Sequence, residues 1–149
     1  MPNSNPLDIL NAYIKQHKLR RTYERERVLE YILTIDGHFT IQSVHEEMNK
    51  ETPISRGSIY NIIELFLNAG IVVRHPFAGA EAEYETTMRA STHHHRICTS
   101  CGAIKEFSDQ KFSRAIKNRT FASFQPKFHS IYIYGLCKKC QPKIKKTKK

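Results

Sequence analysis

The chain has 149 residues, of which 40% are hydrophobic and 26% are charged, and its formal net charge is +10. This length suits one domain or two small ones, and the pattern shows no long apolar run or leader, which argues against a membrane-spanning or secreted protein. We therefore expect a soluble, cytoplasmic protein whose modest core is supported by a structural metal or a partner subunit.

The first 70 residues have the pattern of four amphipathic helices. Apolar residues recur there at three- and four-residue spacing between capping signals. The helices are expected to start after Pro6, after Thr22, at Thr40 and after Ser55. Thr22 and Ser55 are expected N-caps, and Gly70 is the expected stop of the fourth helix.

A hairpin is predicted directly after the fourth helix. Residues 71–73 and 83–87 read as two strands, and residues 76–80 read as the turn between them. Helices followed by such a hairpin are typical of a winged helix-turn-helix. The prediction for this half of the chain is therefore a DNA-binding fold.

In a winged helix, the last helix enters the major groove with its N-terminus first. Its opening polar residues are therefore the candidate DNA contacts: Arg56, Ser58, Tyr60 and Asn61. A basic cluster over residues 15–27, which includes Arg20 and Arg25, could face phosphates. The alternative interpretation is an ordinary amphipathic helix with a polar start.

The four cysteines form two CxxC pairs: Cys98 with Cys101, and Cys137 with Cys140. In a cytosolic chain thiols stay reduced, which favours a metal over disulfides. Four thiolates form the tetrahedral cage that structural zinc prefers, and Gly102 and Gly135 suit turns beside them. A redox CxxC or unrelated buried thiols are the alternatives.

Three consecutive histidines directly precede the first cysteine pair. In a strand, His93 and His95 would point to the same face. Three residues from the return strand and from the first half could reach that face: Glu106, His38 and Glu85. Imidazoles with carboxylates suit iron(II), manganese or zinc. The remaining histidines before the run are interpreted as ordinary surface or core residues: His17, His45 and His75.

Several segments together resemble the ferric uptake regulator family over nearly the whole chain. They are RRTYER near residue 20, GHFT, ISRGSIYNIIELFLNAGIV, the YE pair, HHHRICTSCGAIKEFSD and IYIYGLCKKC. The resemblance implies a homodimeric, metal-dependent repressor that reads AT-rich inverted repeats in double-stranded DNA. It also implies that the four cysteines hold zinc and that a regulatory metal lies between the domains, on His38, Glu85, His93, His95 and Glu106.

The predicted fold class is α+β. A winged helix-turn-helix over residues 1–87 is followed by an α/β dimerisation domain with a four-cysteine zinc site over residues 88–149. The first segment carries nine Lys and Arg against twelve Asp and Glu, and the second carries fifteen against two. Much of this excess is a lysine-rich tail from Lys138 to Lys149, which we expect to be disordered and either solubilising or DNA-contacting.

Three positions depart from the family pattern. Asn61 stands where many members have an arginine, and the stretch from Glu85 to His93 is one residue longer than usual. Ser113 occupies the place of an acidic ligand, which leaves His94 and His129 as a weak extra metal site.

The resemblance favours iron(II) as the effector, with manganese or zinc as alternatives. Zinc-sensing relatives often use a cysteine in the sensing site, and the peroxide-sensing branch typically has aspartates in place of Glu85 and Glu106. Metal affinity should fall below about pH 6, since histidine must lose its proton to bind. A hinge is expected near residues 88–92.

Two other classes stay open. One is a constitutive, zinc-stabilised DNA-binding module with inert histidines. The other is a metalloenzyme, which the lack of an HExxH pattern disfavours. Neither a small organic substrate nor a membrane partner is expected.

Overall fold

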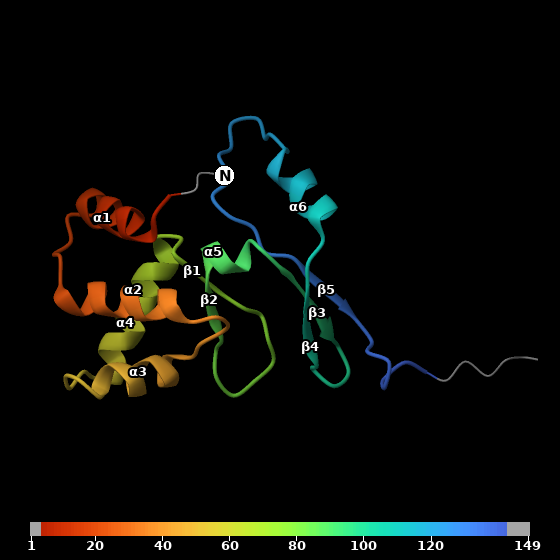
Figure 1. Cartoon of the computed structure of the whole chain (residues 1–149), viewed down its shortest axis with the longest axis horizontal. Coiled ribbons are helices and arrows are strands. Elements are labelled where there is room, and N and C mark those ends of the chain that lie inside the picture. The colour runs from red at the N-terminus through yellow and green to blue at the C-terminus, as the bar shows by residue number, and fades with distance from the viewer. Residues whose placement is uncertain (1–3, 143–149) are drawn as a thin grey trace, which may run out of the picture.

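The computed structural model describes residues 4–142 and has two parts that lie side by side (Figure 1). The first part holds four helices and a hairpin: α1 (Pro6–Gln16), α2 (Tyr23–Thr34), α3 (Ile41–Asn49), α4 (Arg56–Asn68), β1 (Val72–Arg74) and β2 (Tyr84–Thr86). The second part holds α5 (Thr87–Ala90), β3 (His94–Cys98), β4 (Ile104–Phe107), α6 (Gln110–Lys117) and β5 (Tyr132–Gly135). Most of the predicted lysine-rich tail lies outside the described residues. Over residues 4–142, no helix combines the length and the apolar character that crossing a membrane requires.

Local hydrogen bonds start the helices where the sequence predicts. Thr22, Thr40 and Ser55 are N-caps, and each accepts a hydrogen bond from the backbone N–H three residues later. Gly70, with φ of +78°, follows the end of α4 in a conformation that favours glycine. The predicted winged helix is therefore present, with β1 and β2 as an antiparallel wing.

The main hydrophobic core lies within this first part. Fifteen buried residues form one cluster, to which all four helices and both wing strands contribute. An isolated antiparallel bridge between Phe39 and Tyr84, with two N–H···O bonds of 2.8 Å, ties the α2–α3 loop to the wing. This bridge brings the neighbouring residues His38 and Glu85 close together.

The second part is a three-stranded sheet in the order β4-β3-β5, in which β3 pairs antiparallel with β4 and parallel with β5. Helix α6 begins at Gln110, directly after Asp109, whose side chain caps it, and it buries no residue. Large apolar side chains stay exposed in this part: Phe112, Phe121, Phe124, Ile133, Tyr134 and Leu136. This part therefore has little core of its own.

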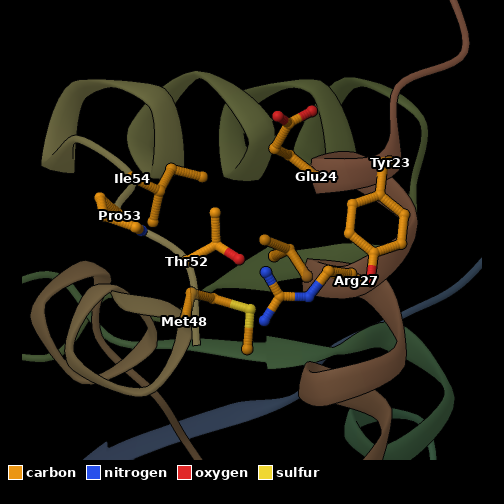
Figure 2. A pocket seen from close by; sticks show the side chains of 8 residues that line it. Tyr23, Glu24, Arg27, Met48, Thr52, Pro53 and Ile54 are labelled. Carbon is orange, nitrogen blue, oxygen red and sulfur yellow. The ribbon is translucent and has the colours of Figure 1, made fainter. Parts of the chain in front are cut away.

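A small hollow lies between α2 and the turn that leads to α4 (Figure 2). Its volume is about 30 Å³, and Tyr23, Arg27 and Met48 are among its lining residues. This volume can hold a water molecule but no larger ligand.

Candidate metal centres and DNA-binding surface

Strand pairing brings the histidines and glutamates of the predicted regulatory site together between the two parts. The bridge at Phe39 places His38, its neighbour, beside Glu85 at the middle of β2. In the second part, His95 on β3 pairs directly with Glu106 on β4. Because side chains alternate along a strand, His93 faces the same side as His95.

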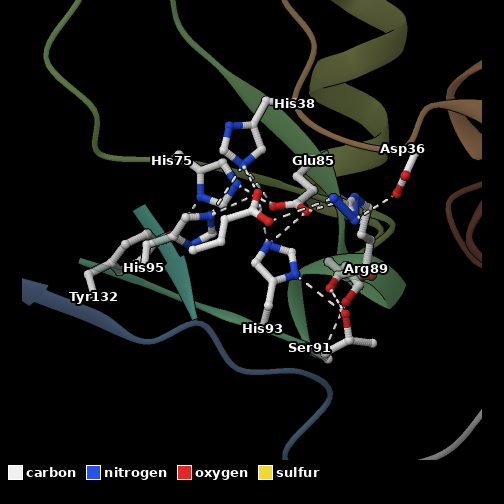
Figure 3. A network of polar contacts seen from close by, with 12 residues as sticks. Asp36, His38, His75, Glu85, Arg89, Ser91, His93, His95 and Tyr132 are labelled. Carbon is white, nitrogen blue, oxygen red and sulfur yellow. Dashed lines mark hydrogen bonds and ion pairs between the residues drawn. The ribbon is translucent and has the colours of Figure 1, made fainter. Parts of the chain in front are cut away.

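The five predicted residues are distributed over two overlapping groups, which share His38 and His95 and in each of which the ligand atoms lie within 4.8 Å of one another. The first group adds His75 and Glu85, and the second adds His93 and Glu106. Figure 3 shows His38, His75, Glu85, His93 and His95 pointing toward one another. His38 Nε2 lies 3.3 Å from Glu85 Oε2 and 3.2 Å from His95 Nε2. His93 Nε2 lies 3.2 Å from Glu85 Oε1, and the distance from His93 Nε2 to Glu106 Oε1 is 3.7 Å. The candidate metal ligands thus come both from the helix–wing region and from the C-terminal sheet.

His75 also belongs to this cluster, although the sequence pattern led us to interpret it as an ordinary histidine. It is buried, and its Nε2 lies 2.7 Å from Glu85 Oε2 while its Nδ1 lies 2.6 Å from the Tyr132 hydroxyl. In the wing, Val73 on β1 pairs with Glu85 on β2. His75 lies two residues after Val73 and therefore has its side chain on the same face of the wing as Glu85. That register is the signal that could have identified it. His17 and His45 lie outside the cluster, at the C-terminal cap of α1 and on α3 respectively.

Glu85 reaches the site despite the extra residue that follows it. Residues 87–90 form one turn of helix, α5, in the stretch for which the sequence suggested a hinge. The Thr87 hydroxyl donates to the carbonyls of Gly70 and Ile71, which anchors α5 to the turn after α4. The connection after Glu85 is thus helical, and the Glu85 carboxylate is fully buried.

The pKa values of three members of the cluster are shifted: those of Glu85, His95 and His38. Burial alone would raise the pKa of Glu85, but hydrogen bonds from His38 and His75 and the nearby charge of His93 hold it at about 2. Burial, together with the neighbouring imidazoles, lowers the pKa of His95 to about 4. The hydrogen bond to Glu85 raises the pKa of His38, although burial opposes it. Glu85 is therefore ionised and His95 neutral near pH 7, as metal ligation requires.

Two atoms at the centre indicate that a cation fits here. Within residues 4–142, Glu85 Oε1 and His93 Nε2 are buried and make no hydrogen bond. Buried polar atoms without a partner are costly, and a divalent ion would bind both. Three imidazoles or more with two carboxylates match Fe²⁺, Mn²⁺ or Zn²⁺.

His94 points to the opposite side of β3, away from this cluster. Its Nε2 lies 3.4 Å from the Ser113 hydroxyl, and its ring centroid lies 6.4 Å from that of His129. Among the described residues, no third His, Cys, Asp or Glu completes a metal-binding group with these two. The predicted weak extra site therefore consists of two imidazoles and a hydroxyl.

The four cysteine thiols are free and gather at the ends of β3 and β5, where their sulfur atoms all lie within 4.8 Å of one another. Cys98 Sγ accepts hydrogen bonds from the backbone N–H groups of Cys101 and Cys137, and these lower the pKa of the Cys98 thiol to about 6. Gly102 has φ of +76° in the turn, as expected. Gly135 is instead the last residue of β5, where it pairs with Cys98. The geometry suits tetrahedral zinc.

The candidate DNA contacts on α4 are exposed along its first two turns: Arg56, Ser58, Tyr60 and Asn61. Arg56 is held by Gln42 on α3, at 2.8 Å, and by Glu81 of the wing loop, at 3.4 Å. Arg20 and Arg25 lie apart from these, before and within α2, where the Arg25 guanidinium donates to the Arg20 carbonyl.

Comparisons with known proteins agree with this geometry. The model of the ferric uptake regulator family matches residues 16–134. The chain belongs to this family of metal-responsive transcriptional regulators. This confirms the family and the α+β fold class predicted from the sequence, and it groups the chain with transcription regulators rather than with enzymes.

Relatives of this Fur-family protein include a repressor and several solved regulators. The peroxide-responsive repressor PerR of Staphylococcus aureus is 28% identical over 134 residues, which are 89% of each chain. The Helicobacter pylori ferric uptake regulator superposes with a TM-score of 0.62 at 21% identity, covering 95% of this chain and 97% of that one. The Vibrio cholerae ferric uptake regulator superposes with a TM-score of 0.53 at 29% identity, covering 85% of this chain and 98% of that one.

Proposed function

We propose that this protein is a metal-dependent transcriptional repressor whose effector is iron(II). The observation that carries the proposal is the convergence of His38 and Glu85 from the first part with His93, His95 and Glu106 from the second. An ion bound to residues of both parts stabilises one relative orientation of the two parts. Metal binding would therefore favour the orientation in which the DNA-binding helices can contact DNA. His75 supports the site by binding Glu85. The His94 and His129 pair is proposed only as a weak extra site.

DNA binding is proposed for the winged helix of residues 1–87, and assembly as a homodimer for residues 88–149. The exposed start of α4 supports DNA binding, since a helix N-terminus with Arg and Asn side chains can contact base edges and phosphates. The exposed aromatic and aliphatic side chains of the second part support dimerisation, because an exposed apolar surface of this kind is normally covered by a partner. A twofold dimer would match an AT-rich inverted repeat. The four cysteines would hold structural zinc.

The proposal is tested by DNA binding as a function of metal. Zinc-containing protein is titrated onto an AT-rich inverted repeat, anaerobically, with and without iron(II), as the parent and as His93→Ala and His17→Ala. Metal should raise the affinity of the parent and of His17→Ala by about 5- to 150-fold, the usual range of such coupling. His93→Ala should show no such rise. Equal affinity of the parent with and without iron(II) would contradict the proposal.

A second candidate function is peroxide sensing, which the similarity to the Staphylococcus aureus repressor favours. The same nitrogen and oxygen donors suit iron(II), which peroxide oxidises. Brief peroxide treatment of the iron-loaded protein should then abolish DNA binding and add an oxygen to a ligand histidine, detected by mass spectrometry. Intact ligands and unchanged binding would leave iron sensing as the function.

Metal affinity should rise with pH through a window set by His38. Its pKa is raised above 6.5, so its proton competes with the metal at higher pH than the value near 6 expected from sequence. Each displaced proton changes the affinity by about tenfold per pH unit. Manganese(II) titrations from pH 6 to 8 should give a shallower slope for His38→Asn than for the parent. Identical slopes would assign the proton to another residue.

A further inference from the structure

Arg89 places a permanent positive charge beside the proposed metal site. Arg89 lies on α5, and its guanidinium contacts three carboxylates from three segments, two of which, Asp36 and Glu85, are labelled in Figure 3. Nη1 lies 3.0 Å from Asp36 Oδ1, Nε lies 3.4 Å from Glu85 Oε1, and Nη2 lies 3.9 Å from Glu106 Oε2. The Arg89 side chain is 26% exposed, and Glu85 is fully buried. Screening by solvent is therefore weak at Glu85.

These contacts oppose metal binding. Two of the carboxylates that Arg89 contacts, those of Glu85 and Glu106, are also the two acidic residues of the proposed metal-ligand set. A divalent cation bound to them would lie close to the positively charged guanidinium. Within the described residues, Arg89 Nε and Glu85 Oε1 are buried, and neither makes a hydrogen bond. The pair is therefore held by charge alone and can separate without losing a hydrogen bond.

The surroundings provide a place for the displaced guanidinium. Asp36 is 95% exposed and already touches Nη1, so the side chain can keep this partner while it leaves the other two. A groove of about 340 Å³ runs beside it, lined by Asp36, Arg89 and residues that include Leu33, Met88 and Thr92. This volume is large enough for a guanidinium to rotate away from the cluster.

We propose that Arg89 is an internal counter-cation that competes with the metal for Glu85 and Glu106. The inference rests on the proposed function of this site. In the metal-free protein, Arg89 links the two parts by binding carboxylates on β2 and β4. Metal must displace it toward Asp36, so Arg89 lowers metal affinity and sets the concentration at which the protein responds.

The test measures manganese(II) affinity by chelator competition in zinc-containing protein without DNA. Arg89→Gln removes the charge, Arg89→Lys keeps it, and Arg96→Gln is the matched control. Arg96 lies on β3 with its guanidinium over the ring of Phe107 and its side chain exposed. Arg89→Gln should bind manganese(II) about tenfold more tightly than the parent, since a weakly screened unit charge is removed. Arg89→Lys and Arg96→Gln should stay within about twofold of the parent.

Two further measurements separate competition from a general change of charge. Metal-free Arg89→Gln should melt about 2–4 °C below the parent, because the link between the parts is lost. Asp36→Asn should weaken manganese(II) binding in the parent, where Arg89 then stays on the ligands, but not in the Arg89→Gln background. Unchanged or weaker binding by Arg89→Gln would overturn the inference. If a folded parent binds no manganese(II) while keeping its zinc, the proposed function itself fails.

Discussion

Replacing Cys98 with serine is expected to unfold the C-terminal part of the protein while the winged helix stays folded. The main core cluster lies entirely within the first part, and α6 buries no residue. Structural zinc is worth about 10–16 kcal/mol in small zinc-dependent peptides, far more than so small a core supplies. Losing one of four ligands should therefore remove the ion and, with it, the packing of β3 against β5.

Zinc content and hydrogen exchange would check this expectation. Cys98→Ser should purify without stoichiometric zinc, and amides of β3, β4 and β5 should lose protection while those of α2 and α4 keep it. Dimerisation and DNA binding should be lost together. Ser100→Ala, in the same turn but without a ligand atom for zinc, is the control and should behave like the parent. Full zinc content or an unchanged melt in strong chelator would contradict a structural zinc site.

Replacing Glu85 with glutamine is expected to abolish the metal response without unfolding the protein. Glutamine keeps the shape of the side chain but removes the charge that contacts His38, His75 and His93. Loss of outer-shell partners alone costs metal sites about 10- to 100-fold in affinity, so losing a buried anionic ligand should cost about 100-fold or more. Metal-dependent DNA binding should then disappear at metal concentrations that saturate the parent.

The matched control is Glu83→Gln, which removes the same charge from a neighbouring residue outside the metal-binding groups. It should shift manganese(II) affinity by no more than a few fold. Circular dichroism should show both variants folded at 25 °C. If Glu85→Gln bound manganese(II) like the parent, Glu106 and the histidines would form the site without it, and ligation across the two parts would rest on His38 alone.

Much of the local structure could be predicted from the sequence because its causes are local. Thr22 and Ser55 cap helices through hydrogen bonds to residues three positions away, and Gly70 follows α4 in a conformation that other residues disfavour. Likewise, the alternation of side chains along β3 explains why His93 and His95 share one face while His94 takes the other. Spacing along β3 therefore separated His93 and His95 from His94.

Other features depended on contacts between distant segments, which spacing does not encode. His75 joins the site because the wing register places it beside Glu85, and because Tyr132 approaches it from 57 positions away. The connection after Glu85 left the position of this residue open in the sequence, whereas the structure places Glu85 in contact with His38, His75 and His93.

The sequence by itself determined the winged-helix pattern, the two cysteine pairs and the run of three histidines, since each depends on residue types at short, regular intervals. The proposed regulatory set, which also includes His38, Glu85 and Glu106, was predicted through the resemblance to the family, because these residues lie far apart in the chain. Only the tertiary structure decided what surrounds those residues. In the sequence, nothing distinguishes Arg89 from an ordinary surface cation, yet the fold places its guanidinium in contact with Asp36, Glu85 and Glu106. The balance between this cation and a metal depends on distances and burial, which arise only when the two parts pack together.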